Sequence, residues 1–76
     1  MTQLQREIKQ KTDELAGRFG MMVDLATACK IFGCKSPNTA ARALRELQVE
    51  PVRICGKARY EVDRIARRIV ELRGMG

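Results

Sequence analysis

DLATACKIFGCKSPNTAARALR, residues 24–45, has the pattern of two short helices joined by a tight turn. Asp24 is a favourable N-cap for the first helix, because its carboxylate can accept a hydrogen bond from the first helical turn. Gly33 ends this helix. The apolar residues between them repeat at helical spacing and fall on one face, namely Leu25, Ala28, Cys29 and Phe32. We therefore expect Cys29 to serve as a small core residue.

Ser36 and Pro37 define the start of the second helix. Serine is a strong N-cap, and proline at the first helical position sacrifices no hydrogen bond and already has a helical φ. One face of this helix is apolar and consists mostly of small residues, namely Ala40, Ala43, Leu44 and Leu47. Because small residues let two helices pack closely, we predict a helix-turn-helix in which the second helix lies across the first.

The residues that follow predict a β-hairpin. Residues 49–54 are rich in β-branched side chains, residues 55–58 provide a turn, and residues 59–62 form the returning strand. Tyr60 alternates with its neighbours in this strand, so we expect it to point inward. The short apolar segment at residues 21–23 is expected to pair with the hairpin as an additional strand.

Two further helices flank these elements. The N-terminal helix, predicted over residues 3–16, is amphipathic, and we expect it either to pack on the rest of the domain or to form a dimer contact. Its narrow apolar stripe consists of Leu4, Ile8 and Leu15. Asp63 is expected to cap the last helix. The buried stripe of that helix is predicted to contain Ile65, Ile69 and Leu72, with Val70 exposed beside it.

Composition limits the classes of function that this chain can have. A chain of 76 residues builds only a small core, which leaves little stability for a deep substrate pocket. It contains no histidine, no paired carboxylates in an apolar setting and no nucleophile with a plausible base, so we expect no catalytic residues. Its three cysteines lack metal-binding spacing, and we expect reduced thiols with no metal and no cofactor. Since no apolar run is long enough for a membrane span or a signal peptide, we predict a cytoplasmic protein without a membrane partner.

The basic residues are placed where a nucleic acid could contact them. Fifteen Lys and Arg oppose nine Asp and Glu, a net charge of +6, and ten of the cations are Arg, whose planar fork pairs with phosphate and with guanine edges. On the second helix of the helix-turn-helix, the candidate DNA contacts are Lys35, Ser36, Asn38, Thr39, Arg42 and Arg45. On the hairpin, they are Arg53, Lys57 and Arg59. A major groove about 12 Å wide admits one helix, so this helix is the candidate for base recognition.

The candidate residues differ in expected role. Asn38, Arg42 and Arg45 suit base edges, whereas Ser36, Thr39 and the N-terminal amides of the helix suit phosphate oxygens. A solvated face is the alternative for these cations. Lys57 at the hairpin tip is expected to contact phosphate. Two interpretations stay open for Arg59, which either contacts phosphate or pairs with Glu61 or Asp63.

Three segments, LATACKIFG, SPNTAARALREL and VRICGKARYEVDRI, together resemble the winged helix-turn-helix of MerR-type regulators and phage excisionases. The resemblance covers residues 23–72 and implies that Arg42 and Arg45 lie on the recognition helix and that Lys57 and Arg59 belong to the wing. The turn between residues 33 and 39 is one residue longer than such motifs often show, which leaves open whether Ala41 or Arg42 points deepest into the groove. Because no long coiled coil follows, the chain is more similar to excisionases and other small phage DNA-binding proteins than to full regulators.

The sequence therefore predicts a mainly α fold with a small β-hairpin, in which a winged helix-turn-helix over residues 19–76 follows an amphipathic helix over residues 1–18. The predicted function is sequence-specific binding of double-stranded DNA, as a phage or mobile-element excisionase or a small transcriptional regulator. Expected partners are DNA, a second copy of the chain as a homodimer or cooperative oligomer, and an integrase or other phage protein. Two alternatives are the DNA-recognition subunit of a viral packaging terminase, and a protein–protein adaptor that does not bind DNA.

Overall fold

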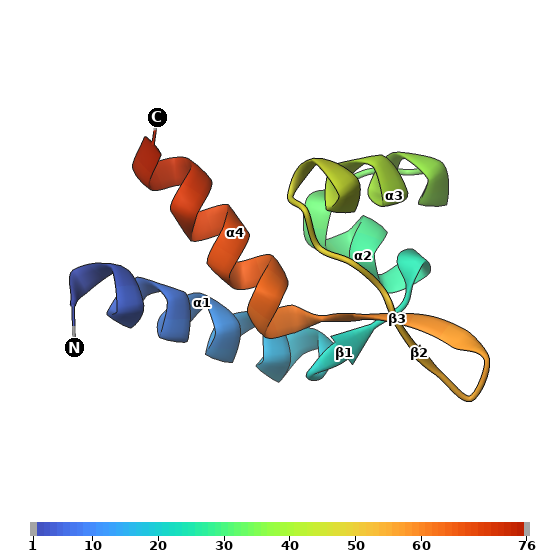
Figure 1. Cartoon of the computed structure of the whole chain (residues 1–76), viewed down its shortest axis with the longest axis horizontal. Coiled ribbons are helices and arrows are strands. Elements are labelled where there is room, and N and C mark those ends of the chain that lie inside the picture. The colour runs from blue at the N-terminus through green and yellow to red at the C-terminus, as the bar shows by residue number, and fades with distance from the viewer. Residues whose placement is uncertain (1, 76) are drawn as a thin grey trace.

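The computed structural model describes residues 2–75, without the side chain of Met75. It is mainly helical with a small antiparallel sheet, as predicted (Figure 1). Along the chain the elements are α1 (Gln3–Phe19), β1 (Met22–Val23), α2 (Leu25–Phe32), α3 (Pro37–Glu46), β2 (Val52–Ile54), β3 (Lys57–Glu61) and α4 (Val62–Met75). None of the helices within this described part is long and apolar enough to cross a membrane.

The sheet has the order β1-β3-β2, so β3 is its central strand. Val23 of β1 pairs with Tyr60 of β3, which confirms the predicted additional strand. On the other side of β3, Val52 pairs with Arg59 and Ile54 pairs with Lys57. Tyr60 is buried, as expected from its place in the alternation. The sheet is thus a hairpin whose base is held to the core by one short strand.

The helices pack in two pairs, α1 on α4 and α2 on α3. In Figure 1, α2 and α3 lie at one side of the molecule above the hairpin, and α1 and α4 lie at the other side, where they diverge from the sheet toward the two termini. Alanines contribute where helices approach closely: Ala28 of α2, Ala40 of α3 and Ala66 of α4 are all fully buried. Burying small residues lets the two helices of each pair approach closely, which accounts for a compact core in so short a chain.

Side-chain caps begin the first three helices. Thr2 and Gln5 form a capping box at α1, in which each side chain accepts a hydrogen bond from the other residue's backbone N–H. At α2 the carboxylate of Asp24 accepts from the Thr27 N–H at 2.9 Å. At α3 the hydroxyl of Ser36 accepts from the Asn38 N–H at 3.2 Å. The caps predicted at Asp24 and Ser36 are therefore confirmed.

The same backbone closure ends both α2 and α3. Gly33 has φ 71°, and the next residue, Cys34, donates its N–H to the carbonyl of Cys29 at 3.0 Å. Gln48 has φ 60°, and Val49 donates to the carbonyl of Leu44 at 2.9 Å. In each case a residue in the left-handed region turns the chain back over the last helical turn. The two ends of α3 are thereby fixed by local hydrogen bonds.

Three expectations about the flanking helices are wrong. α1 continues to Phe19 and does not end at residue 16, because Gly17 is accommodated within the helix. Asp63 is not the N-cap of α4, since the helix begins at Val62, whose N–H donates to the carbonyl of Met21 at 2.9 Å. Asp63 lies instead in the first turn.

The third correction concerns the buried stripe of α4. Val70 is 1% exposed and Leu72 is 54% exposed, the reverse of the prediction. The stripe runs through Val62, Ile65, Ala66 and Val70. It is rotated from the predicted position because α1 packs along α4, and Val70 lines the groove between these two helices together with Glu7 and Lys11 of α1. The spacing of apolar residues within α4 alone could not predict this contact with α1.

Candidate nucleic-acid interface

The outer face of α3 carries the candidate base-reading residues. Asn38, Arg42 and Arg45 are all exposed, and their spacing of four and three residues places them on one side of the helix. On the opposite side, Ala40 and Leu44 are fully buried in the core. The helix is therefore held by one face while the other presents polar and cationic side chains to solvent. Thr39 is exposed as well, on the first turn.

The N-terminal end of α3 is partly occupied by its own cap. Ser36 is half-buried and one lone pair of its hydroxyl oxygen accepts from Asn38, while its hydroxyl proton could still be donated to a phosphate oxygen. Pro37 has no N–H to offer. Lys35, exposed in the turn, supplies a charge at this end. Capping is thus the role that the contacts give to Ser36.

The hairpin divides its three cations between two faces. Residues that pair across adjacent strands share a face, so Lys57 and Arg59 lie on the same side as Ile54 and Val52. Arg53 pairs with Ala58 and lies on the other side, the side of the buried Tyr60. Lys57 and Arg53 are exposed, whereas Arg59 is half-buried.

The hairpin turn consists of Cys55 and Gly56, with φ of 54° and 77°. Two successive positive φ values give the turn whose twist matches that of the flanking strands. Because this turn joins Ile54 directly to Lys57, it fixes the register and so sets which cations share a face.

Arg59 lies beside Asp24 and does not pair with either carboxylate that the sequence suggested. The Thr27 N–H is the main cause of a lowered pKa at Asp24, the Thr27 side chain adds to it, and the positive charge of Arg59 lowers the pKa further against the opposing effect of burial. The Arg59 guanidinium also donates to the carbonyl of Ala58 at 3.2 Å. Arg59 thus lies close enough to the N-terminus of α2 for its charge to act on Asp24, while its hydrogen bond stays within the hairpin.

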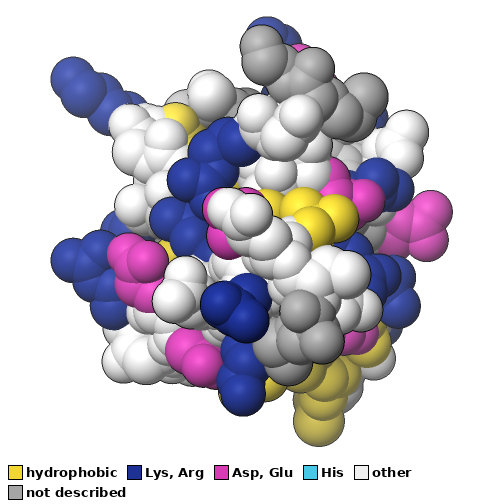
Figure 2. Space-filling model, turned by 90° about the vertical axis from the view of Figure 1, so that its left-hand side faces the viewer, with side chains coloured by type: hydrophobic (Ala, Val, Ile, Leu, Met, Phe, Trp, Pro, Cys, Tyr) yellow, Lys and Arg dark blue, Asp and Glu magenta, His cyan; other side chains and the backbone are white. Residues whose placement is uncertain are grey.

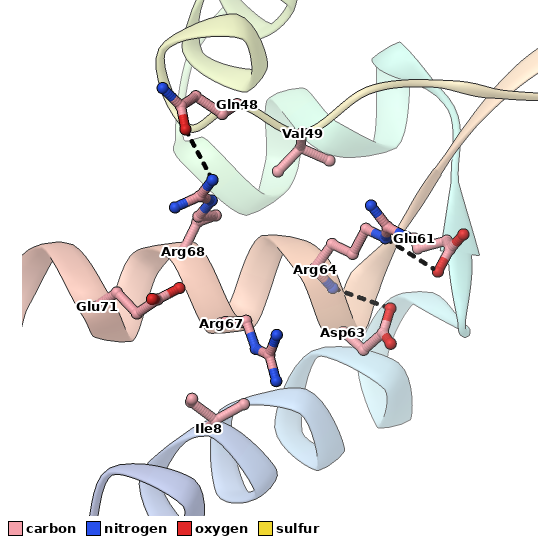
Figure 3. Close-up of a pocket in the computed structure, with 9 residues that line it drawn as sticks. All are labelled: Ile8, Gln48, Val49, Glu61, Asp63, Arg64, Arg67, Arg68 and Glu71. Carbon is pink, nitrogen blue, oxygen red and sulfur yellow. Dashed lines mark hydrogen bonds and ion pairs between the residues drawn. The ribbon is translucent and has the colours of Figure 1, made fainter.

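The expected partners of Arg59 are used by another residue, Arg64. Glu61 forms an ion pair with the Arg64 side chain at 3.6 Å, and Asp63 accepts a hydrogen bond from the Arg64 backbone N–H at 2.9 Å (Figure 3). The pairing of Arg59 with Glu61 or Asp63 is therefore wrong. The signal that could have identified Asp24 is strand register: Val23 pairs with Tyr60, so Asp24 comes opposite Arg59.

The arginines of α4 are arranged differently from those of α3. Figure 3 shows a groove between α4, the end of α3 and α1, in which Arg68 donates to the side-chain oxygen of Gln48 at 2.7 Å. Arg64 is engaged by Glu61, and Glu71 lines the same groove. Carboxylates thus alternate with arginines here, and two of the three arginines already have partners within the chain.

The segment that forms the candidate interface is basic. Residues 24–61, from the N-cap of α2 to the end of β3, contain seven Lys and Arg and four Asp and Glu, which gives +3 of the net charge of +6. The N-terminal end of α3 and the hairpin tip lie toward the same end of the long axis of the molecule (Figure 1). Figure 2 shows the opposite end, where Lys and Arg are interspersed with Asp and Glu.

Residues 2–75 contain no group of three or more His, Cys, Asp or Glu side chains placed to hold a metal ion. Comparisons of the chain with family models, characterised proteins and solved structures find no match. The chemistry of α3 and of the hairpin is thus the basis on which a function can be inferred.

Proposed function

We propose that this chain binds double-stranded DNA in a sequence-specific way, as a winged helix-turn-helix in which α3 is the recognition helix and the β2–β3 hairpin is the wing. The observation that carries the proposal is the outer face of α3. Asn38, Arg42 and Arg45 are exposed there, on a helix whose other face is buried. Within residues 2–75 the single ion pair joins Arg64 to Glu61, so Arg42 and Arg45 are available to a ligand.

The dimensions of this face suit a short DNA site. Residues 38 and 45 are seven positions apart, which is about 10 Å along a helix that rises 1.5 Å per residue. Base pairs are spaced about 3.4 Å apart, so the face spans roughly three base pairs. Arg pairs with the O6 and N7 atoms of guanine and Asn with the N6 and N7 atoms of adenine. We propose Arg42, at the centre of the face, as the main base contact.

The hairpin has the form required of a wing. Arg53 and Lys57 lie on opposite faces of a two-stranded ribbon, within one residue pair of its turn. A ribbon that enters a minor groove is flanked by phosphates on both sides, so cations on two faces can each neutralise one strand of the duplex. Arg59 contributes less to binding in this proposal, because Asp24 already offsets part of its charge.

Within DNA-binding proteins, we propose a phage or mobile-element excisionase or a small transcriptional regulator. The support for this narrower assignment is the sequence resemblance over residues 23–72. The same chemistry would serve in the DNA-recognition subunit of a packaging terminase, and the two roles differ in the DNA that is bound. Several phased sites that bend the duplex favour excision, whereas a single packaging site favours the terminase.

The test is selection of binding sites from a library of random duplexes, followed by titration of the selected site at several salt concentrations. With five to seven phosphate contacts, the logarithm of the binding constant should fall with the logarithm of salt concentration at a slope of about −4.5 to −6.3. A selection that enriches no sequence, together with a slope near zero, would overturn the proposal. That result would favour the protein–protein adaptor.

A further inference from the structure

Two half-buried cysteines meet where α2 ends. The closure at this point runs from the carbonyl of Cys29 to the N–H of Cys34, with Gly33 in the left-handed region. A closure of this kind brings the side chains of its first and last residues into contact. At the end of α3 the corresponding pair is Leu44 and Val49, and both are buried in the core. At the end of α2 the pair consists of two free thiols.

The hydrogen bond limits how far apart the two residues can be. Standard bond lengths on either side of the N···O distance of 3.0 Å leave the Cα atoms of Cys29 and Cys34 at most about 7 Å apart. The bent geometry at the amide and at the carbonyl brings them closer than this limit. Disulfides join Cα atoms that are usually about 4.4 to 6.8 Å apart. The backbone therefore already has the spacing that a disulfide requires.

The thiol groups also interact with each other. Burial raises the pKa of the Cys29 thiol, and hydrogen bonding with the Cys34 thiol raises it further. The Cys34 thiol donates to the carbonyl of Ser36 at 3.7 Å. Both side chains pack against the hydrophobic core, which restricts the directions in which they can turn. The closure of the turn and the packing of both side chains thus keep the two thiols in the same part of the fold.

We propose that Cys29 and Cys34 form a redox-active dithiol, which a small-molecule disulfide such as oxidised glutathione converts to an intramolecular disulfide. The Cys34 thiolate attacks one sulfur of the oxidised glutathione and displaces the first glutathione thiolate. The Cys29 thiolate then attacks the Sγ atom of Cys34 and displaces the second. One S–S bond breaks and another forms, while the two thiol protons and two electrons of the protein leave with two molecules of reduced glutathione.

The order of the two steps follows from the surroundings of Cys29. A thiolate is the attacking species, and the raised pKa of Cys29 lowers its thiolate fraction at neutral pH. Cys34 is therefore the first nucleophile. The resulting bridge closes the turn directly before α3, so it locks the connection between α2 and α3. The proposal depends on the geometry of this turn and holds whether or not the chain binds DNA.

The experiment uses the full chain with Cys55→Asn, which removes the exposed third thiol at the hairpin turn. Folded protein is incubated with oxidised glutathione, quenched with iodoacetamide and weighed by mass spectrometry. The expected product has lost two hydrogen atoms and carries neither glutathione nor an alkyl group. A matched variant that adds Cys34→Ser should not lose the two hydrogens, and Cys29→Ala serves the same purpose if the serine variant does not fold by circular dichroism.

The rate of disulfide formation is then compared between the folded chain and the chain unfolded in concentrated urea. This comparison separates the effect of the folded geometry from the effect of the short separation in sequence. Ring closure should be about tenfold faster or more in the folded chain, because a held pair has a higher effective concentration than the ends of a flexible loop. Two glutathiones on each folded chain, or two thiols that remain alkylatable after equilibration, would overturn the proposal. Equal rates of closure in the folded and unfolded chains would overturn it as well.

Discussion

Arg42→Ala and Lys57→Ala should weaken DNA binding in two different ways, because the two side chains occupy different parts of the proposed interface. Arg42 is exposed in the middle of the outer face of α3, and Lys57 is exposed beside the hairpin turn. A guanidinium can read a base edge with two parallel hydrogen bonds. An ammonium group on a wing neutralises phosphate whatever the sequence beneath it.

The magnitudes follow from these roles. Loss of one bidentate base contact costs about 1–3 kcal/mol, or roughly 5- to 150-fold in Kd on the preferred site. On a scrambled duplex the loss should be smaller, because no matching base is present. Loss of one phosphate contact lowers the salt slope by about 0.9, for example from about −5.4 to about −4.5 when six phosphates are contacted. Lys57→Ala should therefore weaken binding to both duplexes by a similar factor and reduce the salt dependence of binding to both.

Fluorescence anisotropy with a selected duplex and a scrambled duplex of equal length measures all of these quantities. Arg6→Ala is a matched control, because Arg6 is an exposed arginine near the start of α1, toward the opposite end of the molecule (Figure 1). Each of these exposed substitutions should leave the free energy of unfolding within about 0.5 kcal/mol of the original value. Equal losses for Arg42→Ala and Lys57→Ala on both duplexes, with equal slopes, would refute the assignment of α3 as the base-reading element.

Three further predictions concern stability. Asp24→Ala should cost about 0.5–2 kcal/mol of unfolding free energy in urea titrations at neutral pH, whereas Asp24→Asn retains the cap. Folding lowers the pKa of Asp24 below its usual 3.8. The ionised carboxylate therefore stabilises the folded state above pH 3.8, and this stabilisation is lost as the pH falls through the pKa that Asp24 has in the folded state. Asp24→Asn should lack this loss of stability in acid. Cys55→Asn should raise the melting temperature by roughly 2–4 °C, which corresponds to about 0.5 kcal/mol of unfolding free energy. The reason is that Asn tolerates the positive φ of 54° at this exposed turn better than Cys does. An unchanged or lower melting temperature would contradict this prediction. Val70→Asp should abolish the helical circular dichroism signal at room temperature, because a buried charge costs as much as the roughly 3–5 kcal/mol of stability that so small a core supplies. The exposed substitution Leu72→Asp should leave the signal intact. The opposite result would show that α1 does not pack on α4 as described.

The sequence was sufficient to predict features that short segments determine. The caps at Asp24 and Ser36 depend on a side chain and an amide two or three residues away, so composition alone reveals them. The face of α3 that points outward follows from the same 3.6-residue period that buries Ala40 and Leu44. Six of the nine candidate residues lie on this helix or directly before it, which explains why its exposed residues could be identified from the sequence.

Features that depend on packing between distant segments were not predictable in this way. The buried position of Val70 comes from the contact of α4 with α1, which are more than forty residues apart. Arg59 and Asp24 lie close together because β1 pairs with β3. The division of Arg53 and Lys57 between two faces depends on which two residues form the turn, and the sequence had suggested a four-residue turn. In each case, a local pattern is compatible with more than one tertiary arrangement.

The residues that position α3 are separate from the residues proposed to contact DNA. Ser36 caps its start, Gln48 turns the chain at its end, and Ala40 and Leu44 fix its inner face. None of these four is needed for reading bases, and the exposed residues of the outer face contribute no buried area to the core. Substitutions on the inner face should therefore change the free energy of unfolding, and substitutions on the outer face should change binding alone. For the proposed DNA-binding function, it follows that sequence preference can vary without loss of the fold, because the limited stability of the core does not depend on the side chains that are proposed to read the site.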